Sequence, residues 1–325
     1  MSTRRQCLAI LVLCFASISM TACSSTPAGK SEGGKDKVAV VVSTKDNPWF
    51  VVLADAAAGR AKELGYDVSV FDSQNDPGKE AATFDNIITG GFKAVLFNPT
   101  DSEASIANVR KAKAAGIPVF CIDREINAND AAASQILSDS SPGCIELGQY
   151  FVKTLGGKGE YVELQGILGD NNTKIRSEGF HSVVDHSPGL KMVAQKSADF
   201  NRDKANDAMQ SILQANPNIV AVFCGNDAMA LGAYQALVTA GKDKQVKVFG
   251  FDGADEVVKL IGQGKIQATC MQFPKKMART AAEEADQWIK GKHDFEQKTL
   301  VGVELVTPEN VANYGDYGSK EEATK

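Results

Sequence analysis

The chain has 325 residues, of which 43% are hydrophobic and 23% are charged, and its formal net charge is −5. This acidic balance disfavours nucleic acid as a partner and any broad basic docking surface. The length is too great for one typical hydrophobic core and suits two.

Residues 1–22 predict a secretory signal. Two arginines precede an apolar stretch over residues 8–18, which is shorter than the roughly 20 residues that span a membrane. The sequence MTAC at 20–23 resembles a bacterial lipobox, so we expect a lipid on Cys23; the alternative is an ordinary cleaved signal with a chance cysteine. Residues 23–36 are polar and predict a flexible tether. We therefore expect an exported protein, in the periplasm or on the outer face of the cell membrane, anchored only through its lipid.

From residue 37 onward, strand-like and helix-like segments alternate, which is typical of an α/β protein with parallel sheets. Helical patterns cover residues 48–64, 79–90, 102–115, 142–155, 201–215, 228–240 and 274–289. Strand patterns cover residues 38–42, 67–71, 94–97, 119–122, 134–137, 160–164, 191–193, 220–223 and 246–249. Asn47 followed by Pro48 is a favourable start for the first helix, as cap and first helical residue.

Four of these strands stop at polar side chains. Ser43 follows the first strand, and the pair Asp123 and Arg124 follows the fourth. Asn226 and Asp252 come shortly after the last two strands. Because small ligands bind outside the carboxyl ends of strands in open α/β sheets, these side chains indicate a polar ligand that is rich in hydroxyl groups.

The strands divide into two units. The first unit closes around Asp123, and the second begins near residues 138–140 and ends near Cys270. The helix over residues 274–289 has no partner strand in the second unit and could belong to the first, which composition alone does not prove. That alternative would need the chain to cross between the units more than once.

The sequence carries no G-x-S-x-G elbow, no Walker phosphate loop and no G-x-G-x-x-G, so we expect no cofactor. Its three histidines form no metal-ligand pattern, and we expect no metal. Cysteines 121, 144, 224 and 270 lack CxxC spacing, and three of them lie within or at the ends of predicted strands. We expect them to be buried free thiols.

Ten short motifs together resemble the bacterial D-ribose-binding proteins. They are STKDNPWF at 43–50, FDSQ at 71–74, NPTD at 98–101, IDR at 122–124, ELQG at 163–166, RSEGF at 176–180, ADF at 198–200, NDAMALGA at 226–233, GFDG at 250–253 and QFP at 272–274. The matches are in order, similarly spaced, and cover nearly everything from residue 37 to about residue 306.

The resemblance implies a type I periplasmic binding protein fold, with two Rossmann-like lobes joined by a three-segment hinge. The N-terminal lobe would comprise residues 37–137 plus 272–301, and the C-terminal lobe residues 138–271 plus 302–312, with a tail over residues 313–325. The ligand-binding residues implied are Ser43, Asn47, Trp49, Phe50, Asp123 and Arg124 from the first lobe, Arg176, Phe200, Asn226 and Asp252 from the second, and Gln272 at the hinge.

These residue types suit a sugar. Carboxylates such as Asp123 and Asp252 accept bonds from hydroxyl groups, and arginines donate several bonds from a rigid fork. Aromatic rings cover the apolar faces of the sugar. The adjacent Asp123 and Arg124 are expected to pair, which limits the cost of burying their charges. The resembled family usually has phenylalanine at the position of Trp49, whose larger ring and N–H group would reshape the pocket or add a bond.

The leading hypothesis is a lipid-anchored, monomeric substrate-binding protein that closes around D-ribose or a similar monosaccharide and delivers it to the permease and ATPase of an ABC importer. Allose, another pentose or ketose, or a furanose-like molecule remain alternatives for the ligand. Two other hypotheses are a receptor that serves chemotaxis, and an exported sugar-acting enzyme that uses Asp123 and Asp252 as an acid–base pair. A sugar-responsive repressor is disfavoured, because a signal and tether stand where its DNA-binding helices would be.

Overall fold

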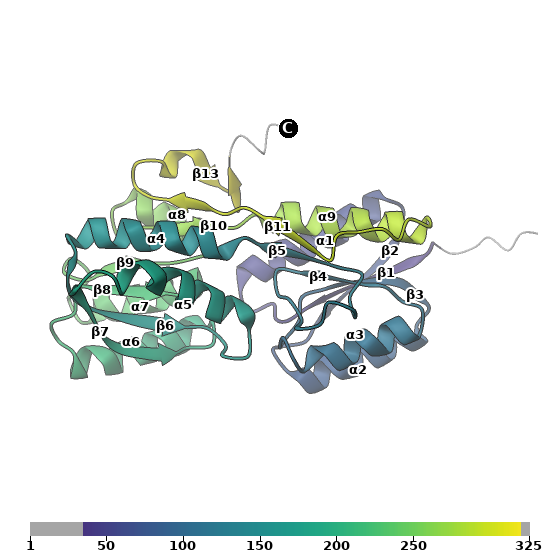
Figure 1. Ribbon diagram of the computed structural model, residues 1–325, viewed down its shortest axis with the longest axis horizontal. Coiled ribbons are helices and arrows are strands. Elements are labelled where there is room, and N and C mark those ends of the chain that lie inside the picture. Colours follow the sequence, from purple (N-terminus) through teal and green to yellow (C-terminus); the bar gives the residue numbers. More distant parts are fainter. Residues whose placement is uncertain (1–34, 320–325) are drawn as a thin grey trace, which may run out of the picture. The chain divides into compact units, whose positions relative to one another are not determined.

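A computed structural model describes residues 35–319, which hold two parallel sheets (Figure 1). The larger sheet has six strands, every neighbouring pair of which is parallel. Their spatial order is β11 (Lys298–Val301), β5 (Ser134–Ser138), β4 (Val119–Ile122), β3 (Phe92–Phe97), β1 (Lys37–Val42) and β2 (Asp67–Asp72). We call the part built on this sheet the first lobe.

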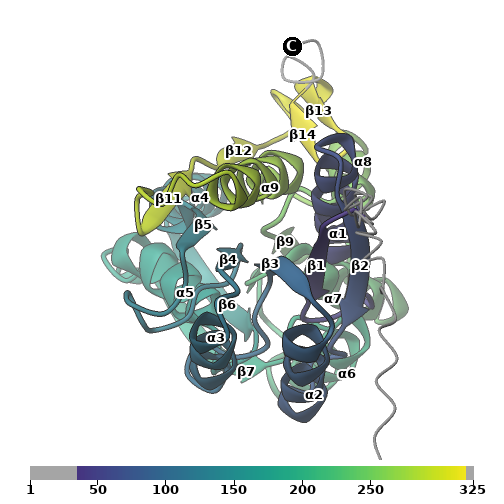
Figure 2. The ribbon, with the colours of Figure 1, turned by 90° about the vertical axis from the view of Figure 1, so that its right-hand side faces the viewer.

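Helices cover both faces of the larger sheet. They are α1 (Pro48–Glu63), α2 (Pro77–Thr89), α3 (Ser105–Ala114) and α9 (Pro274–Ile289). Figure 2 shows α9 above this sheet and α2 and α3 below it. Along β1, Val40 packs in the core that contains α1 and α9 residues, whereas Val41 packs in the core that contains Phe84 of α2. Since both faces are buried, the strand is a continuous apolar run, as is usual for parallel sheets.

The second lobe is built on a four-stranded parallel sheet. Its spatial order is β7 (Gly189–Ser197), β6 (Lys158–Gln165), β8 (Ala221–Cys224) and β9 (Lys247–Phe249). The helices of this lobe are α4 (Ser140–Leu155), α5 (Asn171–Val184), α6 (Arg202–Ala215), α7 (Asp227–Thr239) and α8 (Asp255–Gly262). Among them, α4 packs against α5, and α6 packs against α7.

The chain crosses between the lobes three times: from β5 to α4, from β10 (Thr269–Met271) to α9, and from β11 to β12 (Glu304–Val306). Strands β10 and β12 pair antiparallel beside the second lobe. This arrangement confirms the predicted fold class, two lobes with parallel sheets joined by a three-segment hinge. It also shows α9 on the first-lobe sheet, as expected for a helix without a partner strand in the second unit.

Some elements differ from the sequence expectations. The helix expected over residues 102–115 begins only at Ser105, because the Asp101 carboxylate accepts the N–H groups of Glu103 and Ala104 in a turn before it. No bounds were predicted for helices α5 and α8; α5 opens on polar residues, and α8 has only eight residues.

The segment predicted as a tail contains ordered structure in its described part. A 3₁₀ turn, η1 (Val311–Asn313), leads into a small hairpin of β13 (Tyr314–Gly315) and β14 (Gly318–Ser319). Tyr317 in this hairpin packs against the main hydrophobic core. The hairpin therefore belongs to the folded unit.

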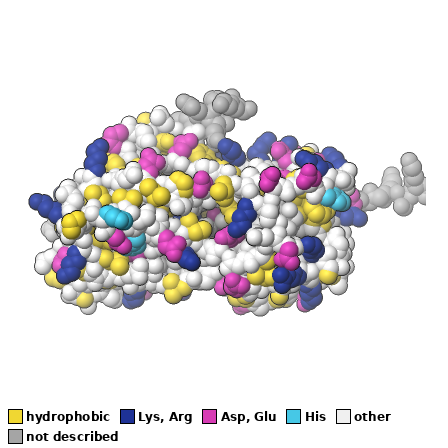
Figure 3. Space-filling view, in the orientation of Figure 1, with side chains coloured by type: hydrophobic (Ala, Val, Ile, Leu, Met, Phe, Trp, Pro, Cys, Tyr) yellow, Lys and Arg dark blue, Asp and Glu magenta, His cyan; other side chains and the backbone are white. Residues whose placement is uncertain are grey.

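The predicted signal segment, Cys23 and the tether up to residue 34 lie outside the described residues, as do residues 320–325. Within residues 35–319, no helix is long and apolar enough to cross a membrane. In the same range the four cysteines are free and buried, as predicted. On the face seen in Figure 3, basic and acidic side chains are interspersed rather than gathered by sign.

Candidate functional site

The carboxyl ends of both sheets border a cleft that contains two neighbouring cavities. The outer cavity has a volume of about 450 Å³, and the inner chamber one of about 20 Å³, which is room for roughly one water molecule. The inner chamber is lined by Asn47, Trp49, Phe50, Asp123, Arg124, Asp170, Asn172, Arg176, Phe200, Asn226, Asp252 and Gln272. Ten of the eleven residues predicted to bind the ligand are thus brought together.

Ser43 is the exception, because it lines neither cavity. Its fully buried hydroxyl donates to Asn98 Oδ1 at 2.6 Å. Asn98 in turn donates from Nδ2 to Asp123 Oδ2 at 3.2 Å. Ser43 therefore supports Asp123 from behind instead of facing the chamber. Asn98 was missed, although it directly follows β3 and so shows the same strand-end pattern as Asp123.

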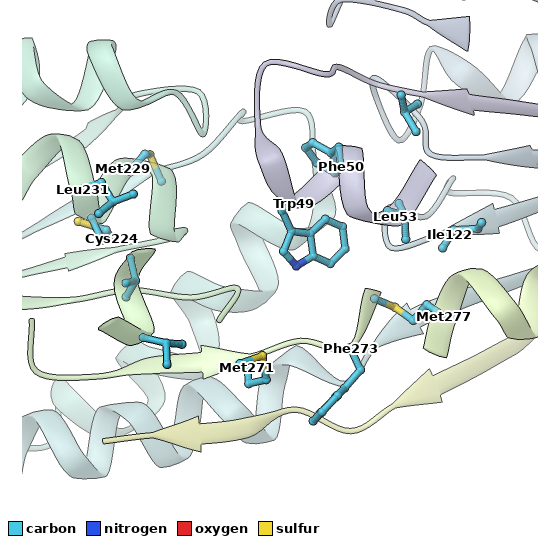
Figure 4. Packing of buried hydrophobic residues seen from close by; sticks show 14 of the residues in the cluster. Trp49, Phe50, Leu53, Ile122, Cys224, Met229, Leu231, Met271, Phe273 and Met277 are labelled. Atoms are coloured by element: carbon cyan, nitrogen blue, oxygen red, sulfur yellow. The ribbon is translucent and has the colours of Figure 1, made fainter. Parts of the chain in front are cut away.

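The start of α1 positions three residues of the chamber. Asn47 Oδ1 accepts the N–H of Trp49 at 3.0 Å, and Pro48 begins the helix, as the sequence predicts. Trp49 and Phe50 then stand in the first turn with their rings edge to face, 5.3 Å apart. In Figure 4 the indole lies between Phe50 and the crossing segment that carries Met271. Trp49 is 2% exposed.

Asp123 and Arg124 do not pair with each other, and this expectation was wrong. Asp123 has a left-handed backbone with φ +67°, and the N–H of Arg124 donates to Ile122 O at 2.8 Å. This tight turn separates the two side chains. Arg124 Nε instead lies 2.7 Å from Asp170 Oδ2 of the second lobe.

The Arg124 guanidinium is held on several sides. Its Nη1 donates to Pro99 O at 3.2 Å, and its centre lies 5.0 Å from the Phe50 ring centroid and 5.7 Å from that of Phe200. Cation–π contacts of this kind stabilise a desolvated arginine. Arg124 thus extends from the first lobe to residues of the second, where a ligand between the lobes would meet its remaining N–H groups.

Arg176 from α5 occupies the corresponding place in the second lobe. Its Nη1 donates to Gly225 O at 2.8 Å and lies 3.3 Å from Asp252 Oδ1. The guanidinium stacks on Phe251 at 4.0 Å from the ring centroid. Gln272 Nε2 donates to the same Asp252 oxygen at 2.7 Å, so the hinge residue is tied to the second lobe.

Burial dominates the electrostatics of the carboxylates in this region. It raises the pKa of Asp123 to about 7, against the opposing effect of Arg176 and Arg124. Burial likewise raises the pKa of Asp252 and that of Asp227, and the repulsion between these two carboxylates adds to the rise at Asp252. Asp227 was missed by the sequence analysis. It accepts from Thr269 Oγ1 at 2.8 Å, behind Asp252.

Phe200 stands in a strained loop before α6. Both Asp199 and Phe200 have positive φ, at +53° and +57°, in the left-handed region that non-glycine residues seldom adopt. The Phe200 ring fills the space above Gly166, where a Cβ atom would lie 2.0 Å from its Cζ. Asn226 caps α7 by accepting the N–H of Met229 at 2.9 Å, and its Nδ2 is 3.5 Å from Phe200 O.

Several polar atoms of the chamber residues are buried yet find no hydrogen-bond partner among residues 35–319. Trp49 Nε1 and Arg176 Nε are donors, and Asp123 Oδ1 and Gln272 Oε1 are acceptors. A buried polar group left unpaired costs about 1–3 kcal/mol. Hydroxyl groups both donate and accept, so a polyhydroxylated ligand can satisfy donors and acceptors together.

Comparison with known proteins places the chain in a family. Residues 38–293 match the model of the periplasmic binding protein domain. The chain is 44% identical over 274 residues to the D-apiose import binding protein of Paraburkholderia graminis, covering 84% of this chain and 88% of that protein. It is 40% identical over 289 residues to the ribose import binding protein of Escherichia coli (strain K12), covering 89% and 96%.

Solved structures agree with this fold. A solute-binding protein from Bacillus halodurans C-125 with bound myo-inositol superimposes with a TM-score of 0.83 at 28% identity, covering 89% of this chain and all of that one. A protein from Actinobacillus succinogenes 130z with bound D-allose gives 0.81 at 30% identity, covering 86% and 100%. The chain therefore belongs to the periplasmic binding protein family, and the resemblance to the ribose-type members is confirmed. These relatives are binding components of transport systems, not enzymes, so the chain is not an enzyme.

Proposed function

We propose that this protein is the substrate-binding component of an ABC sugar importer and holds a monosaccharide in the inner chamber by closure of the two lobes. The observation that carries this proposal is the set of buried, unpaired donors and acceptors contributed by both lobes and the hinge. A sugar ring between the lobes supplies their missing partners. It therefore favours the closed form over the open one by its extra contacts.

D-ribose or a similar monosaccharide is our choice of ligand. The names of the relatives support it, because proteins at about 40% identity are ribose and D-apiose import binding proteins. The unpaired Trp49 N–H argues for a sugar with a hydroxyl on that side of the chamber. Both D-apiose and D-ribose are pentoses; the inner chamber, with about 20 Å³ free, must widen toward the outer cavity to admit a ring of that size.

The remaining features complete the proposal. The first lobe would comprise residues 37–137 plus 272–301, and the second lobe residues 138–271 plus 302–312. The permease and its ATPase, or a chemoreceptor, would bind the protein with its two lobes closed. The protein would act as a monomer in the periplasm or at the outer face of the cell membrane, tethered by a lipid on Cys23. Mass spectrometry of the Cys23→Ser variant beside the native protein tests that anchor through the loss of the lipid mass.

A ligand panel tests the proposed function. We expect D-ribose or D-apiose to raise the melting temperature saturably with one site, ahead of D-allose and myo-inositol, and proton NMR to show each sugar unchanged. Arg124→Ala and Asp252→Ala should each weaken binding roughly tenfold or more, because each removes a charged hydrogen-bonding group. Arg110→Ala is the matched control, as it removes an arginine that is 58% exposed. If no sugar in the panel binds, or if one is converted, the proposal is wrong.

A further inference from the structure

Asp170 stands at the beginning of α5 and was not selected from the sequence. Its backbone is extended, with φ −102° and ψ 124°, and its Oδ1 accepts the N–H of Asn172 at 2.9 Å. These features make it the N-cap of the helix that carries Arg176. A cap is usually exposed, yet Asp170 is only 2% exposed and lines the inner chamber. Its second carboxylate oxygen is therefore available for another role.

That oxygen joins the two lobes. Asp170 Oδ2 lies 2.7 Å from Arg124 Nε, and the two side chains are 1% and 3% exposed. The contact brings opposite charges together, but the N–H does not point at the oxygen, so Oδ2 has no hydrogen bond within the described residues. A buried ion pair compensates its desolvation only when further hydrogen bonds satisfy its atoms. The pair is thus incomplete without another donor in the chamber.

The segment around Asp170 forms the seam where the lobes meet. Ser102 of the first lobe donates its N–H to Gly169 O at 3.1 Å, and its Oγ accepts the N–H of Asn171 at 3.3 Å. Asn172 Nδ2 donates to Asp123 O at 3.3 Å. Separation of the lobes would break these contacts and expose both members of the ion pair to water. The Asp170–Arg124 pair therefore stabilises only the closed arrangement.

We propose that Asp170 is a further ligand-binding and specificity-determining residue, which accepts a hydrogen bond from a sugar hydroxyl through Oδ2 and holds Arg124 across the closed cleft. The part that concerns the sugar rests on the proposed function, and the part that concerns closure does not. With Asp170, three carboxylates face two arginines among the chamber-lining residues. Even with Asp123 and Asp252 partly protonated near neutral pH, these acidic groups roughly offset the two arginines, so the chamber favours a neutral sugar over sugar acids and sugar phosphates.

Asp170→Asn is a sharp test, because asparagine caps a helix as well as aspartate does. The variant keeps the bond to Asn172 but removes the negative charge, and it turns an amide group toward Arg124 or toward the ligand. We expect the Kd for D-ribose, or for whichever of D-apiose, D-allose and myo-inositol binds, to rise roughly 10- to 100-fold, the usual range for coupling of this kind. Asp76→Asn is the matched control. Asp76 caps α2 in the same way but lines neither cavity.

A double-mutant cycle distinguishes a specific role of Asp170 from a non-specific effect of the substitution on the structure. If Asp170 acts partly through Arg124, then Asp170→Asn in the Arg124→Ala background should weaken binding less than it does alone. Equal losses in both backgrounds, or an unchanged Kd in Asp170→Asn, would overturn the proposal. Binding of D-ribose phosphate more tightly than D-ribose by the native protein would overturn the specificity it assigns.

Hydrogen exchange tests the closure without any ligand. The amides of Ser102 and Asn171 are bonded across the seam, so Asp170→Asn should speed their exchange in the sugar-free protein, whereas Asp76→Asn should not. Equal exchange in the native protein and Asp170→Asn would overturn the closing role. If the native protein binds no sugar of the panel, the proposed function fails, and the exchange result still decides whether the pair holds the lobes together.

Discussion

Arg176 Nη1 lies 3.3 Å from Asp252 Oδ1, and the two side chains are 4% and 7% exposed. The same Nη1 also donates to Gly225 O, and the same Asp252 oxygen also accepts from Gln272. The pair is therefore part of a network that joins α5, the end of β8 and the hinge. Since Arg176 Nε has no hydrogen-bond partner within residues 35–319, the network still has a donor to offer a ligand.

Replacing Arg176 by lysine should separate charge from geometry. Lysine keeps the positive charge but has a single ammonium group in place of the planar guanidinium group. It therefore cannot donate hydrogen bonds to Asp252, to Gly225 O and to a ligand at the same time. We expect Arg176→Lys to raise the Kd for the sugar roughly tenfold or more, measured by calorimetry. Arg110→Lys, on the exposed arginine that pairs with Asp130, should leave the Kd unchanged. Equal affinities in the two variants would contradict a direct role for the fork.

Trp49→Phe tests the indole N–H. The variant keeps an aromatic ring but removes the buried donor, so a hydrogen bond to the ligand would be lost at a cost of about 0.5–1.5 kcal/mol, or roughly 2- to 13-fold in Kd. Removing the unpaired N–H should not itself destabilise the unliganded protein. Any loss of stability in Trp49→Phe should come only from the poorer packing of the smaller ring. Trp288→Phe on α9, where the indole stacks on His293, is the control. Affinity that stays the same or improves in Trp49→Phe would show that the N–H does not contact the sugar.

Much of the site could be predicted because parallel sheets place strand ends at one edge. Asp123, Asn226 and Asp252 follow strands directly or after short loops, and the apolar runs before them are easily recognised. Arg176 was different, since on its own it reads as a solvated charge on a helix, and only the resemblance selected it.

The features of the site that the sequence did not predict depend on backbone conformation and on contacts between residues distant in sequence. The left-handed φ of Asp123 turns Arg124 away from it, and no local pattern specifies that angle. Asp170 lies 46 residues beyond Arg124 in the chain, and its local signal was only that of a helix cap. Ser43, at a strand end like Asp123, was predicted to bind the ligand; in the structure its hydroxyl donates to Asn98 Oδ1 and lines neither cavity.

His181 predicts a pH dependence of stability. Its Nε2 lies 3.0 Å from Glu163 Oε2 and its Nδ1 2.9 Å from Asp185 Oδ1. The hydrogen bond to Glu163 above all, together with that to Asp185, raises the pKa of His181 to about 9, against the effect of burial. Because the folded pKa lies above the unfolded value of about 6.5, this stabilisation is complete below that value and is lost as the pH rises toward 9.

The His181→Gln variant checks this expectation. The native protein should lose roughly 1–3 kcal/mol of unfolding free energy from this group between pH 6 and pH 9, and the variant should show a correspondingly flatter decline in urea titrations. His186→Gln, at an exposed position five residues on, is the matched control. An equally steep decline in His181→Gln would mean that the imidazole is not charged by its two carboxylate neighbours.

Gly166→Ala should displace Phe200 from the chamber. An alanine Cβ would lie 2.0 Å from Phe200 Cζ, far inside any real contact, so the ring must move or the loop must shift. Because the ring covers both Arg124 and Arg176, we expect weaker sugar binding, roughly tenfold or more, together with a lower melting temperature. Calorimetry and thermal unfolding measure the two effects.

Two further variants show whether the Gly166 effect has this cause. In a Phe200→Ala background the clash is absent, so adding Gly166→Ala should cost little further stability. Gly59→Ala in α1, where a Cβ meets no atom within 4 Å, should instead stabilise the protein by about 0.5–1 kcal/mol, since alanine is the better helix former. If Gly166→Ala destabilises the Phe200→Ala protein as much as the native one, the close approach of this ring is not the reason for the glycine.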